Sequence, residues 1–301
     1  MTKDKGRSAQ RFDTVGATLV MLSATGFATL PILGKFAYAD GLDLPSTLFW
    51  RFAGAAAVLW VWMLWQGRWR LPMRQAIASI LLGAIGFAIQ SGLFFAALNY
   101  AGAGITSLLL YTYPAFVTLL GWWLEGDRPS SPQLAALVLA FMGCLLTIDL
   151  SGASATPVGL GLAIASGAWY ALYLTFSARI IRSVPPVTMT AYLSTGAGFS
   201  FISIALLGSG LDFPHNLPSG LTLTGIVLIA TVIPIVSIFE GIRRLGTSQA
   251  AILSTLEPIV TVLLGIAFLN EALSIQQILG GLLVIFSVIV LQAFPQKRRG
   301  S

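Results

Sequence analysis

The sequence predicts an all-α integral membrane protein that crosses the bilayer ten times. Of its 301 residues, 56% are hydrophobic and 9% are charged, whereas a soluble domain carries roughly 25% charged residues. A bilayer core about 30 Å thick is crossed by roughly 20 apolar helical residues, so ten crossings use about 200 residues. The remainder suffices for tails and short loops, which excludes a separate water-soluble catalytic domain.

Ten apolar runs of spanning length follow one another along the chain. The expected helices cover residues 14–36, 45–66, 76–98, 103–123, 131–149, 157–178, 187–208, 220–240, 248–268 and 275–294. The first run exceeds the usual 7 to 15 apolar residues of a signal peptide, so we expect it to be retained. Turn residues separate the runs: Gly41, Gly67, Gly126 with Pro129, Gly152, Pro185 with Pro186, Pro214 with Pro218, and Gly246.

Basic residues predict the orientation, because Lys and Arg in short loops stay in the cytoplasm. All but two of them fall in the two tails or after every second helix: Lys3, Lys5, Arg7, Arg11, Arg68, Arg70, Arg74, Arg128, Arg179, Arg182, Arg243, Arg244, Lys297, Arg298 and Arg299. The opposite loops hold Asp40, Asp43, Asp149, Asp212, His215 and Glu271. We therefore expect residues 1–13 and 295–301 to be cytoplasmic tails. This distribution accounts for the net charge of +6 without a nucleic-acid partner.

The two halves of the chain, 14–149 and 157–294, resemble one another. An offset of 144 residues pairs Pro114 with Pro258, Gly102 with Gly246, Leu109 with Leu253, Gly121 with Gly265, Ser130 with Ser274 and Gln133 with Gln277. An offset of 143 pairs Gly16 with Gly159, Leu19 with Leu162, Ser23 with Ser166 and Ala28 with Ala171. Five helices per half is an odd number, so the second half enters the membrane from the opposite side. Two inverted five-helix repeats are a secondary-transporter architecture, with substrate bound near the midplane.

Short motifs in a fixed order add a resemblance to a known family. Arg51-Phe52 opens the second helix, and each half then carries a pair of segments: Tyr113-Pro114 with Glu125-Gly126-Asp127, and Glu257-Pro258 with Asn270-Glu271. On these residues the chain resembles the EamA type of the drug/metabolite transporter superfamily, and within it the bacterial aromatic amino acid exporters. The resemblance implies an inner-membrane location, alternating access and export of small organic molecules. Tyr113 stands where Glu257 stands in the other half, so a role of that glutamate is not symmetric.

Pro114 and Pro258 are candidates for helix kinks that gate a cavity. Each is expected near the middle of a helix, where proline removes a backbone hydrogen bond, and freed carbonyls are tolerated where they face a cavity. A simple packing kink is the alternative. Glu257 is expected near the bilayer centre, where a carboxylate is costly and therefore points to a proton site, a contact for a cationic group or a gate. A protonated Glu257 that hydrogen-bonds the kink is the alternative.

Aromatic and polar side chains on other helices form a candidate substrate site. Residues three and four apart share a helix face, which gives an aromatic stripe on helix 157–178 and a second on helix 103–123. Such walls suit flat, partly apolar ligands, although aromatic side chains also fill helix packing. Gln90 is a further candidate for orienting a substrate, or for joining two helices. The substrate-binding candidates are Ser166, Trp169, Tyr170, Tyr173, Tyr111, Tyr113, Gln90 and Glu257.

Lys35 and Arg51 are the two basic residues outside the cytoplasmic loops and tails. We expect both to reach the interface and to meet Asp40 or Asp43, with a gate or a carboxylate contact as the alternative. The chain has one histidine and one cysteine, and it lacks a nucleotide-binding loop and a zinc-protease motif, so we expect no enzyme, no cofactor and no metal site.

These patterns favour a secondary transporter that exports aromatic or amphipathic small metabolites, with amino acids as the expected class, from sites between helices 1, 3, 4, 6, 8 and 9. A broad exporter of drugs or organic cations, with Glu257 as the cation contact, is the first alternative. A membrane-embedded binding module that transports nothing is the second. Small residues at helix interfaces are compatible with a monomer or a homodimer.

Overall fold

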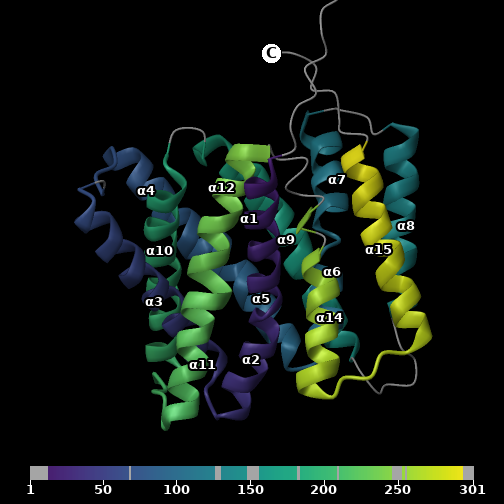
Figure 1. Cartoon of the computed structure of the whole chain (residues 1–301). Helices are drawn as coiled ribbons and strands as arrows, with labels where there is room; N and C mark the ends of the chain where they lie inside the picture. The colour runs from purple at the N-terminus through teal and green to yellow at the C-terminus, as the bar shows by residue number, and fades with distance from the viewer. Residues whose placement is uncertain are drawn as a thin grey trace, which may run out of the picture.

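A computed structural model of the chain describes residues 13–67, 69–125, 130–147, 156–181, 184–208, 210–245, 253–254 and 256–293. Over these residues the fold is all-helical and contains no β-strand (Figure 1). The all-α prediction is therefore confirmed. Of the predicted tails 1–13 and 295–301, every residue except Asp13 lies outside the described residues.

Helices of the first half run from α1 to α8. Their bounds are α1 Thr14–Ala28, α2 Leu30–Ala39, α3 Leu44–Trp65, α4 Met73–Leu81, η1 Leu82–Phe87, α5 Ala88–Leu98, α6 Ala103–Leu110, α7 Tyr113–Glu125 and α8 Ser131–Thr147. Those of the second half are α9 Pro157–Ile181, α10 Pro186–Leu207, α11 Leu217–Val227, η2 Leu228–Val232, α12 Ile233–Leu245, α14 Leu256–Leu269 and α15 Ile275–Ala293.

Six helical stretches among the described residues are long and apolar enough to cross a membrane: Thr14–Ala39, Leu44–Trp65, Met73–Leu98, Pro157–Phe176, Val187–Leu207 and Leu217–Ile238. Shorter apolar helices occupy Ala103–Val117, Leu134–Gly143, Leu256–Leu269 and Ile275–Val290. The chain is thus built for a lipid environment. The count of ten crossings stays a prediction.

One expected helix, 103–123, is interrupted. It consists of α6 and α7, separated by a turn at Tyr111 and Thr112. A proline at position 114 has no backbone N–H with which to continue the α-helical pattern to Leu110, and in a continuous helix a proline ring would clash with the carbonyl four residues earlier. Proline is tolerated in the first turn of a helix, and Pro114 is the second residue of α7.

A π-helical segment lies within the third helix of each half. η1 continues α4 into α5, and η2 continues α11 into α12. The 144-residue offset carries residues 82–87 onto 226–231, which overlaps η2 (228–232). Within η2, the Thr231 hydroxyl donates a hydrogen bond to the carbonyl of Ile226 over 2.7 Å. The hydrophobic pattern did not predict either segment.

Helices from the two halves pack against one another throughout the bundle. α3 contacts α10, α8 contacts α15, α1 contacts α12, α5 contacts α9, and α6 contacts α14. In Figure 1, α8 and α15 lie side by side at one edge of the molecule, and α3 and α10 lie at the other. Between these edges lie the other pairs, α1 with α12, α5 with α9 and α6 with α14.

Two glycines allow η1 and α4 to approach α10 closely. A Cβ at Gly83 would overlap the carbonyl of Leu193, and a Cβ at Gly196 would overlap the carbonyl of Ile80. Small residues permit such backbone contact between membrane helices. Both clashes involve backbone atoms of the neighbouring helix, so each of them can be relieved only by moving a helix.

We expect Gly83→Ala to lower the stability of the detergent-solubilised protein by about 1–3 kcal/mol, the usual effect of overpacking. Gly161→Ala is the matched control, because no atom lies within 4 Å of a Cβ at that position. Thermal unfolding measures both variants. Equal melting temperatures for the two would contradict the close packing of η1 on α10.

Candidate functional site

Tyr111 and Glu257 come from different halves and meet in the interior. Tyr111 follows the last residue of α6, and its hydroxyl lies 2.9 Å from Oε2 of Glu257 and 2.8 Å from the carbonyl oxygen of Ser254. Glu257 is the second residue of α14, where the helix N-terminus favours a negative charge. Tyr111 is buried, and Glu257 is partly buried. The structure thus brings together two of the predicted site residues.

Aromatic rings extend from this contact across the interface between the halves. Ring centroids are 5.9 Å apart for Tyr111 and Tyr113, and 4.9 Å apart for Tyr113 and Tyr170. Tyr170 stacks on Tyr173 at 5.8 Å, and Tyr173 stacks on Phe87 at 5.5 Å.

Phe87 also packs edge-on against Phe52, with centroids 5.4 Å apart. We call this set the aromatic row: Tyr111, Tyr113, Tyr170, Tyr173, Phe87 and Phe52. Its four tyrosines are among the substrate-binding residues predicted from the sequence, whereas Phe87 and Phe52 are not. Phe87 is the last residue of η1, so an α-helical period does not show which way it faces. Phe52 had a signal, since it follows Arg51 in the family motif.

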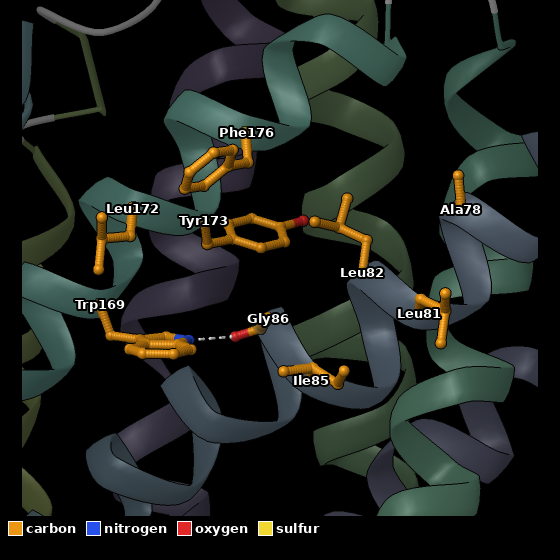
Figure 2. A pocket seen from close by; sticks show the side chains of 9 residues that line it. All are labelled: Ala78, Leu81, Leu82, Ile85, Gly86, Trp169, Leu172, Tyr173 and Phe176. Carbon is orange, nitrogen blue, oxygen red and sulfur yellow. Dashed lines mark hydrogen bonds between the residues drawn. The ribbon is translucent and has the colours of Figure 1, made fainter. Parts of the chain in front are cut away.

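Trp169 and Tyr173 line a groove between α9 and the segment from α4 to η1 (Figure 2). Its volume is about 420 Å³, and its wall consists of Ala78, Leu81, Leu82, Ile85, Gly86, Trp169, Leu172, Tyr173 and Phe176. The indole N–H of Trp169 donates to the carbonyl of Gly86 over 2.8 Å. Leu81, Ile85 and Phe176 are each more than half exposed, so the groove opens to the outside of the bundle. The face of the indole ring remains available to an apolar ligand.

Gln90 and Ser166 bond to each other rather than to the tyrosines. Gln90 Nε2 donates to Ser166 Oγ, and Ser166 Oγ donates to the Gln90 carbonyl, both over 3.2 Å. Both residues are buried. The pair therefore ties α5 to α9, and a similar bond between the halves runs in the reverse direction, from Ser23 Oγ of the first half to the Pro234 carbonyl of the second over 2.8 Å.

The two paired prolines lie in the first turns of α7 and α14. Pro114 is the second residue of α7 and Pro258 is the third residue of α14. Pro258 is buried. Residues 246–252 and Thr255 lie outside the described residues, so the structure shows an interrupted helix directly for Pro114.

Glu271 holds the start of α6 and was not among the predicted site residues. Its Oε1 accepts a hydrogen bond from the Ala103 N–H over 2.6 Å, and its Oε2 accepts one from the Gly104 N–H over 3.2 Å. The preceding Asn270 has a φ of 53°, in the left-handed region. The Asn270-Glu271 motif was a signal, but the contact joins positions 168 residues apart. Asp127, from the other half's motif, lies outside the described residues.

Arg51 does not reach the interface as expected. Its side chain is 3% exposed, and its Nε donates to the hydroxyl of Thr231 in η2 over 3.1 Å. No described carboxylate forms an ion pair with it. α10 and η2 pack over this part of α3, and the position of a residue along a helix does not show such coverage.

The EamA-like transporter family matches the chain over residues 14–149 and again over 157–292. The chain belongs to this family, which is part of the drug/metabolite transporter superfamily. It is therefore a membrane transporter of the EamA type.

The names of similar proteins agree with the assignment of the chain to a transporter family. The uncharacterized transporter YcbK of Bacillus subtilis is 28% identical over 91% of both chains. The uncharacterized transporter YwfM of the same organism is 31% identical over 82% of both chains. The probable amino-acid metabolite efflux pump of Escherichia coli K12 is 28% identical over 70% of this chain and 76% of its own. A solved crystal structure shares the fold with a TM-score of 0.63 and 20% identity, covering 91% of this chain and 95% of the other.

Removing the Glu271 carboxylate tests its role at the start of α6. We expect Glu271→Ala to destabilise the protein by about 1–2 kcal/mol, because two backbone N–H groups lose their acceptor, and Glu271→Gln to lose less. Asp40→Asn, near the same end of the molecule, should change stability by less than about 0.5 kcal/mol. Thermal unfolding of the three variants in one detergent decides the matter, and identical curves for Glu271→Ala and Asp40→Asn would refute the capping role.

Proposed function

We propose that the protein is a secondary transporter that exports aromatic or amphipathic small metabolites, with amino acids as the expected class, by alternating access. The observation that carries this proposal is the aromatic row, which runs between the two halves and ends at Glu257. Substrate sites of transporters built from repeats lie at the interface of the repeats near the bilayer midplane. The row supports such a site because it crosses the interface of the halves, with Tyr111 and Tyr113 in one half and Tyr170 and Tyr173 in the other.

Several matched features support a construction from two inverted five-helix repeats. η1 and η2 overlap under the 144-residue offset. Ser23 and Ser166, paired under the offset of 143, each donate to a backbone carbonyl of the other half, at Pro234 and Gln90. Ten crossings follow if the four shorter apolar helices also span the bilayer together with residues that the structure does not describe.

The chemistry of the row supports the substrate class. Tyrosine and phenylalanine rings bind flat apolar groups through offset-stacked or edge-to-face contacts, and the hydroxyl groups and Glu257 supply a few polar contacts. The Escherichia coli relative is named an amino-acid metabolite efflux pump, which fits this class.

Charge placement supports cytoplasmic termini in an inner membrane. Arg244, at the end of α12, lies 3.6 Å from Asp13 at the start of α1. At the opposite end, the backbone N–H of Asp43 donates to the carboxylate of Asp212 over 3.3 Å. In Figure 1, α1 begins and α15 ends at the same end of the molecule. The end with arginines is then the cytoplasmic one.

Two alternatives differ from this proposal in what crosses the membrane. An exporter of organic cations would use Glu257 as its main contact. A binding module would hold a ligand and move nothing. A homodimer is compatible with each of them, and none requires catalytic chemistry.

Uptake into proteoliposomes tests the proposal. We expect saturable uptake of radiolabelled phenylalanine and tryptophan over alanine and a quaternary dication, and a loss of roughly two- to tenfold in apparent affinity for the aromatic pair with Trp169→Ala. Trp123→Ala is the control, because Trp123 is exposed on α7. Preference for the dication would favour the cation exporter. Binding without movement of any solute would favour the binding module.

Glu257→Gln tests whether the deep carboxylate couples transport to protons. We expect the variant to lose the effect of a pH gradient on uptake, because glutamine keeps the shape but cannot bind and release a proton. Tyr111→Phe removes the hydrogen bond to Glu257 and should shift the pH dependence without abolishing it. If Glu257→Gln keeps both the rate and the pH dependence of the wild type, the coupling role is wrong.

A further inference from the structure

Arg51 is a buried cation in the interior of the bundle. It is the eighth residue of α3, about 10 Å from the start of that helix at 1.5 Å per residue. With an exposure of 3%, it is the one fully buried charged residue in the part of the chain that the structure describes.

Three phenylalanine rings surround its guanidinium group. The guanidinium carbon lies 4.9 Å from the ring centre of Phe52, 5.7 Å from that of Phe95 and 5.9 Å from that of Phe87. Phe52 and Phe87 belong to the aromatic row, and Phe87 stacks on Tyr173. Arg51 therefore lies at the opposite end of the row from Glu257.

One hydrogen bond holds the guanidinium to the protein. Its Nε donates to Oγ1 of Thr231 over 3.1 Å, and the Thr231 hydroxyl in turn donates to the Ile226 carbonyl. Arginine has five N–H donors in a planar fork, and none of the remaining four has an acceptor among the described residues. Cation–π contacts offset part of the desolvation of a buried charge, but they provide no hydrogen-bond acceptor for these donors.

We propose that Arg51 binds the carboxylate of the transported molecule, while Phe52 and Phe87 contact its apolar body. This inference rests on the proposed function and adds the substrate class, namely amphipathic monocarboxylates. The planar fork of arginine matches a carboxylate with two parallel hydrogen bonds. A single negative charge neutralises the site, whereas a doubly charged phosphate would leave excess negative charge against ring faces that are themselves negative. Thr231 positions the fork by fixing Nε.

Ligand pairs that differ in the carboxylate test the assignment. The probes are L-phenylalanine against L-phenylalaninamide, and 3-phenylpropionate against its amide, measured by ligand-induced thermal stabilisation of the purified protein. We expect the wild type to bind each acid at least tenfold more tightly than its amide. Arg51→Gln should reduce this ratio to about twofold or less, and Arg51→Lys should give an intermediate ratio because it keeps the charge but loses the fork.

Arg70→Gln is the control and should keep the wild-type ratio, because Arg70 is exposed and stacks on Trp69 at the surface. If Arg51→Gln does not fold, the ratio in Arg51→Lys decides, and an unchanged ratio there overturns the inference. Failure of the wild type to prefer the acids, or to bind either acid at millimolar concentration, also overturns it.

Uptake of the same probes into proteoliposomes separates the two proposals. Acid binding that depends on Arg51 but without uptake contradicts the transport function alone. Uptake without acid preference contradicts the role of Arg51 alone.

Discussion

Within a bilayer, every backbone N–H and C=O group must find its partner inside the protein, because lipid tails offer none. This chain departs from regular α-helical bonding between α6 and α7, in η1 and in η2. Side chains from the other half bond to backbone groups within η1, just after each π segment and at the start of α6. The hydrogen bonds run from Trp169 to the Gly86 carbonyl, from Ser200 to the Ala84 carbonyl, from Ser166 to the Gln90 carbonyl, from Ser23 to the Pro234 carbonyl, and from the Ala103 and Gly104 N–H groups to Glu271. The other half of the molecule thus supplies hydrogen-bond partners at and beside these irregular segments.

The same requirement explains why scaffold and site share residues. The indole N–H of Trp169 donates to the Gly86 carbonyl in η1, and the same side chain lines the groove. The hydroxyl of Thr231 in η2 donates to the Ile226 carbonyl and accepts a hydrogen bond from Nε of Arg51. Tyr111 stands where α6 ends and bonds Glu257 where α14 begins. A movement of one half against the other would therefore change the hydrogen bonds beside the helix breaks and the contacts of the aromatic row together.

Much of the fold follows from composition, since apolar runs of spanning length and their turn residues identify the helices. The break before α7 lies beside Pro114, whose missing N–H is a local property that the sequence shows, and the gating role of this proline stays a prediction. The π segments were not predictable from periodicity, because their stability depends on contacts such as Gly83 against Leu193. Deep tyrosines and Glu257 were recognisable as costly or unusual residues, but hydropathy does not say which helices touch. Arg51 was misplaced for that reason, since only the packing of α10 and η2 on α3 shows its burial.

We propose that substrate binds between the halves, beside the tyrosines. Tyr170→Cys in a Cys144→Ser background tests it most directly, because Cys144 is the one native cysteine. Membrane-impermeant thiol reagents are applied to either side of oriented vesicles, with and without a transported aromatic amino acid. We expect the cysteine at position 170 to react with the reagents from both sides, and the amino acid to protect it from reaction. Reaction from neither side, or reaction unaffected by any transported solute, would contradict it.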